Sequence, residues 1–432
     1  MLSSLRSAFR IPDLRRRIFF TFWMLVVIRV GTHITVPGIN VAVIRDLISR
    51  GTLFGLFDLF SGGALSSFSV LAMSVTPYIT STIIMQLLTM VIPAWEEMQK
   101  EGGEEGRRKL QQYGRYGTLL LAMIQGLAMA VGLRQAVLSP GWGAYIIIAL
   151  GLTGGTIFLM WLGEQITEYG IGNGISLIIF AGIVSRSPQG ALKLFTYVRA
   201  AGWKLITFGT SESGAIGILN VVFLALIGLL VIAAVVWIQE GERRIPVQYA
   251  KRVVGRKMYG GQSTHIPMKV NQAGVIPVIF ATSLLAFPTT IASFFNHPVA
   301  KWITDALDYR KWPFLTLEFL LIVVFAYFYT AITFNPMEVA NNLKKWGGFI
   351  PGIRPGKPTM LFLDRALTRL TLVGALFLGT IAIMPNFIMT ITGIPNVYFG
   401  GTALLIVVSV ALETMKQIES HLLLRHYQGF LR

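Results

Sequence analysis

Cysteine is absent from the 432 residues, and charged residues are scarce. Without cysteine the chain forms no disulfide, offers no thiolate nucleophile and has no cysteine-ligated metal site. Charged residues make up 13% of the chain, against about 25% in soluble domains. The chain is 54% hydrophobic and has a mean hydropathy of +0.64. This composition is typical of a protein that crosses a membrane many times.

Motifs of nucleotide and metal chemistry are also missing. The sequence has no G-x-x-x-x-G-K-[ST] loop to cradle phosphates, and its histidines show no H-E-x-x-H or similar ligand spacing. The glycines of GIGNG at 170–174 lack the preceding strand that a dinucleotide site needs. The apolar stretches are nearly bare of ionisable groups, which an ion carrier or an intramembrane enzyme would need. We therefore expect no enzyme, no cofactor and no metal site.

Ten apolar stretches are long enough to cross a bilayer, since about 20 apolar residues suffice for one helix. They lie at 18–36, 70–92, 117–137, 143–163, 173–194, 216–238, 271–295, 314–334, 371–391 and 398–415. The fifth is the weakest, because only Ile175 to Val184 is cleanly apolar before a polar interruption at 185–188. We expect an all-α polytopic membrane protein.

Lysine and arginine concentrate in alternate segments between these stretches. The segments before residue 18, at 93–116, at 239–270, at 335–370 and after 415 hold 26 of the 37 basic residues. Cytoplasmic loops carry an excess of basic residues, so these segments belong on the cytoplasmic side. Without the fifth span, the basic loops at 93–116 and 239–270 would lie on opposite sides. The distribution therefore predicts ten spans with both termini cytoplasmic, and it explains the net charge of +17.

A short internal repeat suggests two related halves, at 1–200 and 201–432. Residues 75–79 read VTPYI and residues 275–279 read VIPVI, at the same place in a five-span half. An odd number of spans gives the halves opposite orientations, and inverted repeats place the functional path between them. The repeat is also compatible with two unrelated proline kinks.

Apolar side chains are stacked one helical turn apart in three of the stretches. The pairs are Val75 with Ile79, Ile175 with Ile179, and Val275 with Ile279. Each i,i+4 pair shares one helix face, which is compatible with ordinary packing or lipid contact. A ring of such side chains would alternatively form a dewetted constriction that stops ions.

The two largest cytoplasmic loops, 239–270 and 335–370, mix basic residues with tyrosine, tryptophan, proline and glycine. Contact with lipid headgroups would explain the charge but not the aromatic residues and turn formers. We interpret these loops as docking surfaces for a large, anionic partner.

Eight long motifs follow one another along the chain: FSGGALSSFS, PYITSTIIMQLL, KEGGEEGRRKLQQYGRYGT, WLGEQITEYGIGNGISLIIFAGIV, ERRIPVQYAKRVVGR, QSTHIPMKVNQAGVIPVIFA, FIPGIRPG and RLTLVGALFLG. In these motifs the chain resembles the SecY family, the pore subunit of the bacterial protein-conducting channel. The resemblance implies a clamshell of two inverted five-helix halves around a central hourglass pore. It also implies a lateral gate toward lipid, between the second and third spans and the seventh and eighth.

The resemblance assigns residues to four parts of the channel. The pore ring would comprise Val75, Ile79, Ile175, Ile179, Ile279 and Ile406. A plug, a short helix within about 56–68, would include Phe57, Asp58, Leu59, Phe60, Ser61, Gly62, Gly63, Ala64 and Leu65. Contacts to a motor or ribosome would be Arg243, Arg244, Arg252, Arg256, Lys257 and Arg354. Lateral-gate positions would be Thr80 and Gln125.

One position departs from the family pattern, because Arg256 is followed by Lys257 where relatives often have two arginines. The charge is kept, but lysine lacks the planar fork that binds carboxylates and phosphates at two points.

The implied function is to conduct unfolded secretory proteins across the bacterial inner membrane and to release transmembrane segments into lipid. The implied partners are the small membrane subunits SecE and SecG, the motor ATPase SecA, the ribosome, signal peptides and membrane lipid. A carrier of small hydrophobic solutes remains the alternative, with an intramembrane enzyme third. The large docking loops favour the channel, because a carrier does not need them.

Overall fold

The computed structural model describes residues 9, 11–49, 58, 61–200, 218–249, 252–254, 257–259, 263–293, 297–308, 311–392 and 401–430. Four predicted site residues lie outside this part of the chain. They are Phe57, Leu59, Phe60 and Arg256.

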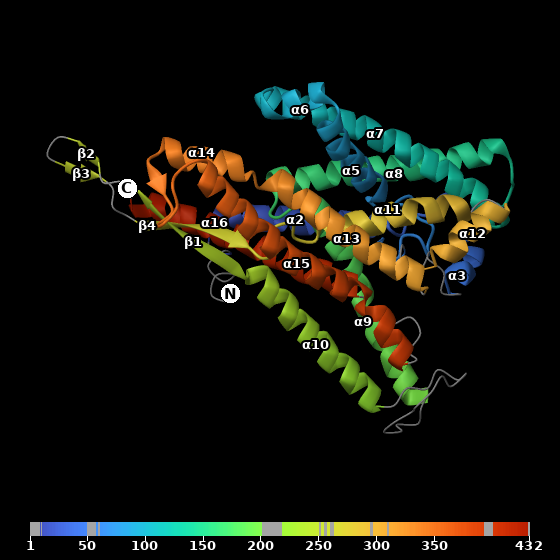
Figure 1. Ribbon diagram of the computed structural model, residues 1–432. Coiled ribbons are helices and arrows are strands. Elements are labelled where there is room, and N and C mark those ends of the chain that lie inside the picture. Colours follow the sequence, from blue (N-terminus) through green and yellow to red (C-terminus); the bar gives the residue numbers. More distant parts are fainter. Residues whose placement is uncertain are drawn as a thin grey trace.

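Helices dominate the fold, as the composition predicts. The first 200 residues form α2 (Pro12–Gly31), α3 (Val41–Ser49), α5 (Thr76–Val91), α6 (Pro93–Lys100), α7 (Gly103–Gly132), the 3-10 helix η1 (Arg134–Ala136), α8 (Trp142–Tyr169) and α9 (Gly174–Ala200). The later residues form α10 (Ile218–Glu240), α11 (Ile276–Ser293), α12 (Pro298–Ala306), α13 (Trp312–Thr333), α14 (Pro336–Lys345), α15 (Lys357–Thr392) and α16 (Gly401–Phe430). Most of the long helices run lengthwise through one bundle, from which α10 diverges (Figure 1).

Within the described residues, six helices are long and apolar enough to cross a membrane, namely α7, α8, α10, α13, α15 and α16. The pair α5 and α6 makes up to seven, with a bend of 105° between its two helices. The apolar part of α11, Ile276–Ala286, is shorter. Each of the ten predicted spans overlaps a helix. Helices α2 and α9 overlap the first and fifth spans, and the helices named above overlap the other eight. The structure is therefore compatible with ten spans.

The fifth predicted span is not interrupted where the sequence suggested. Helix α9 continues through Arg186 and Pro188 to Ala200. The charge is accommodated because the Arg186 guanidinium makes an ion pair with Asp58 and donates a hydrogen bond to Ser66 Oγ at 3.0 Å. The polar residues of this stretch thus have partners within the fold rather than ending the helix.

The start of the second predicted span is also different. Residues 61–75 form consecutive turns, and α5 begins only at Thr76. The turns include left-handed φ angles of 65° at Gly62, 94° at Gly63 and 41° at Phe68. These angles are incompatible with an α-helix. In the described part of the segment that was expected to form a short plug helix, Asp58 is helical and residues 61–68 form turns.

The basic loops contain a small sheet that the sequence analysis did not predict. Strand β1 (Glu242–Tyr249) pairs antiparallel with β4 (Ser263–Lys269), and β5 (Gly348–Phe349) joins its other edge. A second, two-stranded sheet pairs β2 (Arg252–Val254) with β3 (Lys257–Tyr259). The side chains of β1 alternate, so that Ile245 and Val247 face a small core shared with α14 and α15.

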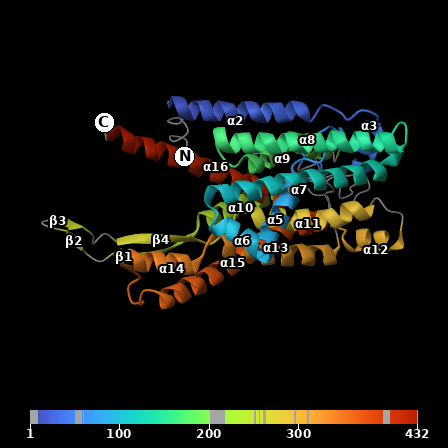
Figure 2. The same ribbon diagram turned by 90° about the horizontal axis from the view of Figure 1, so that it is seen from above.

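The two ends of the bundle therefore differ. The sheets and α14 lie at one end, while α3 and α12 lie at the other (Figure 2). Because β5 belongs to the 335–370 loop and β1 to the 239–270 loop, the pairing of Tyr249 with Gly348 joins both basic loops into one structure.

Candidate functional site

An apolar cluster lies where helices from both parts of the chain meet. It contains all the predicted pore-ring residues. Val75, Ile79, Ile179 and Ile406 are buried in it, and Ile175 and Ile279 are half-buried against it. These side chains come from the start of α5 and from α9, α11 and α16. Val275, which the resemblance left out of the ring, is buried in the same cluster.

The repeated motifs place two of these elements in the same way. Pro77 lies in the first turn of α5, and Pro277 lies in the first turn of α11. Proline is compatible with the first turn because its missing amide hydrogen has no helical partner there. The prolines thus begin helices rather than kink them, and α5 and α11 contact each other.

Residues 61–68 pack closely against α9. A β-carbon on Gly62 would lie 2.9 Å from the Gly182 α-carbon, and one on Gly63 would lie 2.9 Å from Arg186 Nη2. Both glycines also have left-handed φ angles. Glycine is thus required at both positions, by backbone conformation and by contact. Ala64 joins the central apolar cluster.

The next apolar residues of this segment, Leu65 and Phe68, enter a separate cluster. It is formed with residues of α3, α7 and α8. Both side chains are almost completely buried. The segment is thus wedged between two apolar clusters.

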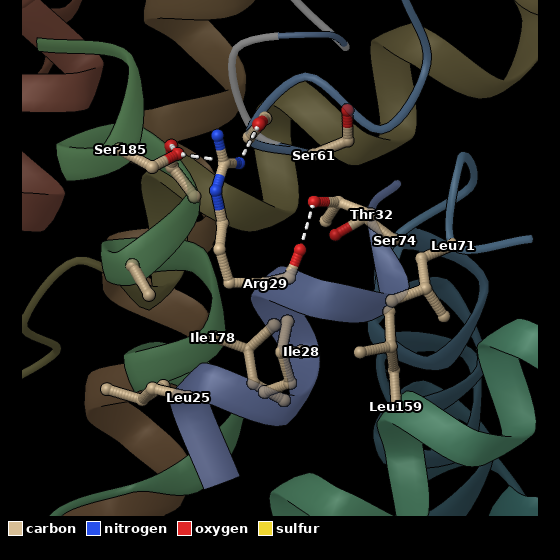
Figure 3. Close-up of a pocket in the computed structure, with 13 residues that line it drawn as sticks. Leu25, Ile28, Arg29, Thr32, Ser61, Leu71, Ser74, Leu159, Ile178 and Ser185 are labelled. Carbon is tan, nitrogen blue, oxygen red and sulfur yellow. Dashed lines mark hydrogen bonds between the residues drawn. The ribbon is translucent and has the colours of Figure 1, made fainter. Parts of the chain in front are cut away.

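A small cavity is lined by residues of this segment and of α2, α8 and α9 (Figure 3). Its volume is about 40 Å³, enough for roughly three water molecules. Arg29 of α2 extends along it and donates hydrogen bonds to the Gly62 carbonyl at 2.7 Å and to Ser185 Oγ at 3.4 Å. The one basic residue inside the first predicted span therefore anchors a backbone carbonyl.

The proposed lateral-gate residues lie on neighbouring helices. Thr80 of α5 is buried, and its hydroxyl donates to the Thr76 carbonyl at 3.1 Å within the same helix. Gln125 of α7 is half-buried. Both α5 and α7 contact α11. The helices that the resemblance places on the two sides of a gate are therefore in contact.

The predicted docking residues that the structure describes, all except Arg256, lie at the end of the bundle that carries the sheets. Arg243 and Arg244 are exposed on β1, where Arg244 Nε donates to Glu242 Oε1 at 2.6 Å. Arg252 begins β2 and Lys257 begins β3. Arg354 is exposed in the turn between β5 and α15, and its carbonyl accepts a hydrogen bond from Thr359 Oγ1 at 2.9 Å.

Sequence reasoning missed the polar partners of the 58–68 segment. Asp58 was assigned only through the family resemblance, and Arg186 belonged to the polar interruption at 185–188. In the structure the Asp58 side chain is 3% exposed and pairs with Arg186 across 128 residues of chain. No periodicity links residues so far apart, so the sequence carried no signal for this pair.

Comparisons with known proteins are consistent with this geometry. The SecY family model matches residues 69–415. The chain is 50% identical over 441 residues to the protein translocase subunit SecY of Halalkalibacterium halodurans, with full coverage of both chains. It is 47% identical over 440 residues to the subunit of the same name from Bacillus subtilis, again over the full length of both.

Solved structures share the fold. A structure described as that of a protein conducting channel has a TM-score of 0.67 at 20% identity, with 94% of this chain and 92% of the other covered. A second, which reports that the plug domain of SecY stabilises the closed channel and maintains a membrane seal, has a TM-score of 0.66 at 20% identity, with the same coverage. Canine Sec61 in a ribosome-channel complex has a TM-score of 0.63 at 18% identity, again covering 94% and 92%.

The matches extend over the whole chain and agree with the apolar helices described above. They establish a multi-pass membrane protein and confirm the resemblance drawn from the motifs. The chain belongs to the SecY family, a family of protein translocation channels.

Proposed function

We propose that this chain is the pore subunit of a bacterial protein translocase. It conducts unfolded secretory proteins across the inner membrane and releases transmembrane segments into lipid through a lateral gate. The observation that carries this proposal is the central apolar cluster, which joins the predicted pore-ring residues from α5, α9, α11 and α16. The two parts of the chain, 1–200 and 201–432, would be the halves of the clamshell.

The chemistry of the cluster suits a seal that must yield to a polypeptide. Branched apolar side chains exclude water, so a closed ring stops ions. A translocating chain is about 10 Å wide when helical. Isoleucine and valine side chains can move apart around it and make no charge-specific contacts that would trap one sequence. The ring therefore fits a channel that accepts many substrates.

The gate would lie between α5 and α7 on one side and α11 and α13 on the other. Signal peptides and transmembrane segments are apolar, so they partition into lipid once a path opens between these helices. Thr80 and Gln125 would be polar positions along that path. On one side of the gate, Phe280 of α11 and Phe325 of α13 pack edge to face, with ring centroids 5.8 Å apart.

Energy and direction would come from partners, because the sequence contains no nucleotide-binding loop. We propose that SecA or a ribosome binds the exposed basic end that carries Arg243, Arg244 and Arg354. Canine Sec61, which shares this fold, is described in a ribosome-channel complex, and this supports the ribosome as a partner. The small subunits SecE and SecG would complete the membrane complex, with both termini of this chain in the cytoplasm.

Site-specific crosslinking tests the path. The chain has no native cysteine, so Ile79→Cys and Ile406→Cys each introduce a single thiol in the cluster. A secretory protein stalled in transit, carrying a photoactivatable thiol reagent, should crosslink to both positions. The matched control is Leu229→Cys on α10, whose side chain is 68% exposed on the bundle surface. If Leu229→Cys reacts with the stalled protein and neither cluster position does, the path does not pass through the cluster.

A further inference from the structure

One face of α9 lies against the turn formed by Asp58 and residues 61–66. Gly182, Ser185, Arg186 and Gln189 are spaced at i, i+3, i+4 and i+7, so they lie on one side of the helix. Gly182 allows the close approach of Gly62. The guanidinium of Arg186 contacts the turn. Its Nη1 also donates a hydrogen bond to Gln189 Oε1 at 3.0 Å, which holds the guanidinium in place.

The Arg186 guanidinium links both ends of the turn. Its Nη2 makes an ion pair with Asp58 Oδ2 and donates to Ser66 Oγ at 3.0 Å. The other carboxylate oxygen, Asp58 Oδ1, accepts from the Ser66 amide at 2.7 Å. One carboxylate and one guanidinium therefore close the loop and fasten it to α9.

Both charges are largely withdrawn from solvent. The exposed fractions of the side chains are 3% for Asp58 and 14% for Arg186. A buried ion whose partner is removed is strongly unfavourable, whereas removing both ions together is often nearly neutral. Lifting the turn from α9 separates the two ions. The closed position is therefore favoured by an interaction that is lost as soon as the turn moves.

A second cation holds the turn from the opposite side. Arg29 of α2 donates to the Gly62 carbonyl at 2.7 Å, and Ser67 Oγ donates to the Thr32 carbonyl, just after α2, at 2.8 Å. All of these polar contacts come from helices in the first 200 residues. The turn is thus fastened to α2 and α9 by polar contacts, while Ala64 belongs to the central apolar cluster and Leu65 to the cluster with α3, α7 and α8.

We propose that Asp58 and Arg186 form a latch that holds the turn in its closed position and sets how readily the channel opens. This inference rests on the proposed channel function and specifies its regulation. A signal sequence must supply the free energy that separates the latch. Weakening the latch therefore lets less hydrophobic signal sequences open the channel, so Asp58 and Arg186 act as positioning residues that determine substrate stringency.

Ion conductance and a double-mutant cycle test the latch. Asp58→Asn and Arg186→Gln should each raise the resting ion conductance of the full channel complex in membranes by about tenfold, because each leaves a buried ion unpaired. The double variant should leak much less than the product of the two single effects, since both act through one ion pair. Arg199→Gln, on an exposed position of the same helix, should leave conductance unchanged. Wild-type conductance in both single variants, or multiplicative effects in the double variant, would refute the latch.

A reversible crosslink keeps the test independent of stability. Asp58→Cys and Arg186→Cys together, joined by a short cleavable bifunctional thiol reagent, should stop transport of a secretory protein into vesicles. Cleavage of the reagent should restore transport. Transport at the uncrosslinked rate while the reagent is in place would contradict the proposal.

The unsubstituted chain separates the two hypotheses. If it transports no secretory protein in the same vesicles, the proposed function fails. If it transports normally but the latch variants neither leak nor accept weakened signal sequences, only the latch fails.

Discussion

Ser74 and Gly274 precede the two copies of the repeated motif and share a left-handed backbone conformation, with φ angles of 52° and 63°. In each copy the following valine immediately precedes a helix, and the amides of Ile79 and Ile279 donate to the Val75 and Val275 carbonyls at 3.0 and 3.2 Å. The repeat is therefore a shared way of starting a helix at the apolar cluster. This finding argues against the reading as two unrelated proline kinks.

Gly274→Ala should destabilise the protein by about 1–2 kcal/mol, the cost of a left-handed conformation for a residue with a β-carbon. A β-carbon there meets no atom within 4 Å, so the effect would be purely conformational. Thermal unfolding in detergent measures it. The matched variant Ser74→Ala changes no backbone demand, because serine already has a β-carbon, and should have the smaller effect. Equal unfolding temperatures for Gly274→Ala and the parent chain would contradict the assigned conformation.

Gly155→Ala should destabilise the protein more than most glycine substitutions. A β-carbon at Gly155 of α8 would lie 2.0 Å from the Val70 carbonyl oxygen, so either the helix or the turn must shift. Overpacking of this kind costs about 1–3 kcal/mol.

The neighbouring Gly154 provides the control, since a β-carbon there meets nothing within 4 Å. Gly154→Ala should stabilise α8 slightly, by up to about 1 kcal/mol, because alanine is the better helix former. Both the accumulation in membranes and the unfolding temperature should therefore fall for Gly155→Ala and rise for Gly154→Ala. Similar behaviour of the two variants would show that α8 does not press against Val70.

Ile79→Ala should raise the ion leak of the resting channel, because shortening a ring side chain opens the apolar seal to water. Conductance in planar bilayers measures the leak, with and without a stalled secretory protein. The same substitution at Ile147, which is 59% exposed on α8, is the control for general damage. An equal leak in both variants would remove Ile79 from the seal.

Arg354→Glu should block motor-driven export while leaving the amount and assembly of the chain in the membrane unchanged. The residue is exposed in the turn before α15, so reversing its charge disturbs a partner rather than the core. Export of a secretory protein, measured beside membrane levels, separates these effects. Lys301→Glu, exposed on α12 at the other end of the bundle, should export normally. Loss of Arg354→Glu from the membrane would instead indicate a structural role.

The sequence predicted the helical class and the family, and each apolar stretch that it marked overlaps a helix. Its errors concerned element boundaries, the sheet at the basic end and long-range pairing. Helix α7 begins at Gly103, well before the predicted span at 117–137. Its first turns are polar and solvent-facing, so hydropathy alone does not mark them as helical. Helix α5 begins six residues late, because left-handed residues in the preceding turns prevent an earlier start.

The sheet at the basic end was hidden for a different reason. Strand β1 alternates buried and exposed residues over only a short stretch, and β5 has two residues. Neither is long enough to stand out from a loop rich in charge and glycine. Their pairing depends on two loops that are distant in sequence but adjacent in the fold.

Hydropathy by itself determined that this chain is a multi-pass membrane protein, and the charge distribution predicts how its loops alternate, because apolar length and basic loops act locally along the chain. Only the tertiary structure decided which residues meet. It brought Ile79, Ile179 and Ile406 into one cluster and placed Asp58 against Arg186. Such contacts depend on how helices pack, and side chains far apart in sequence carry no local pattern that records their partners.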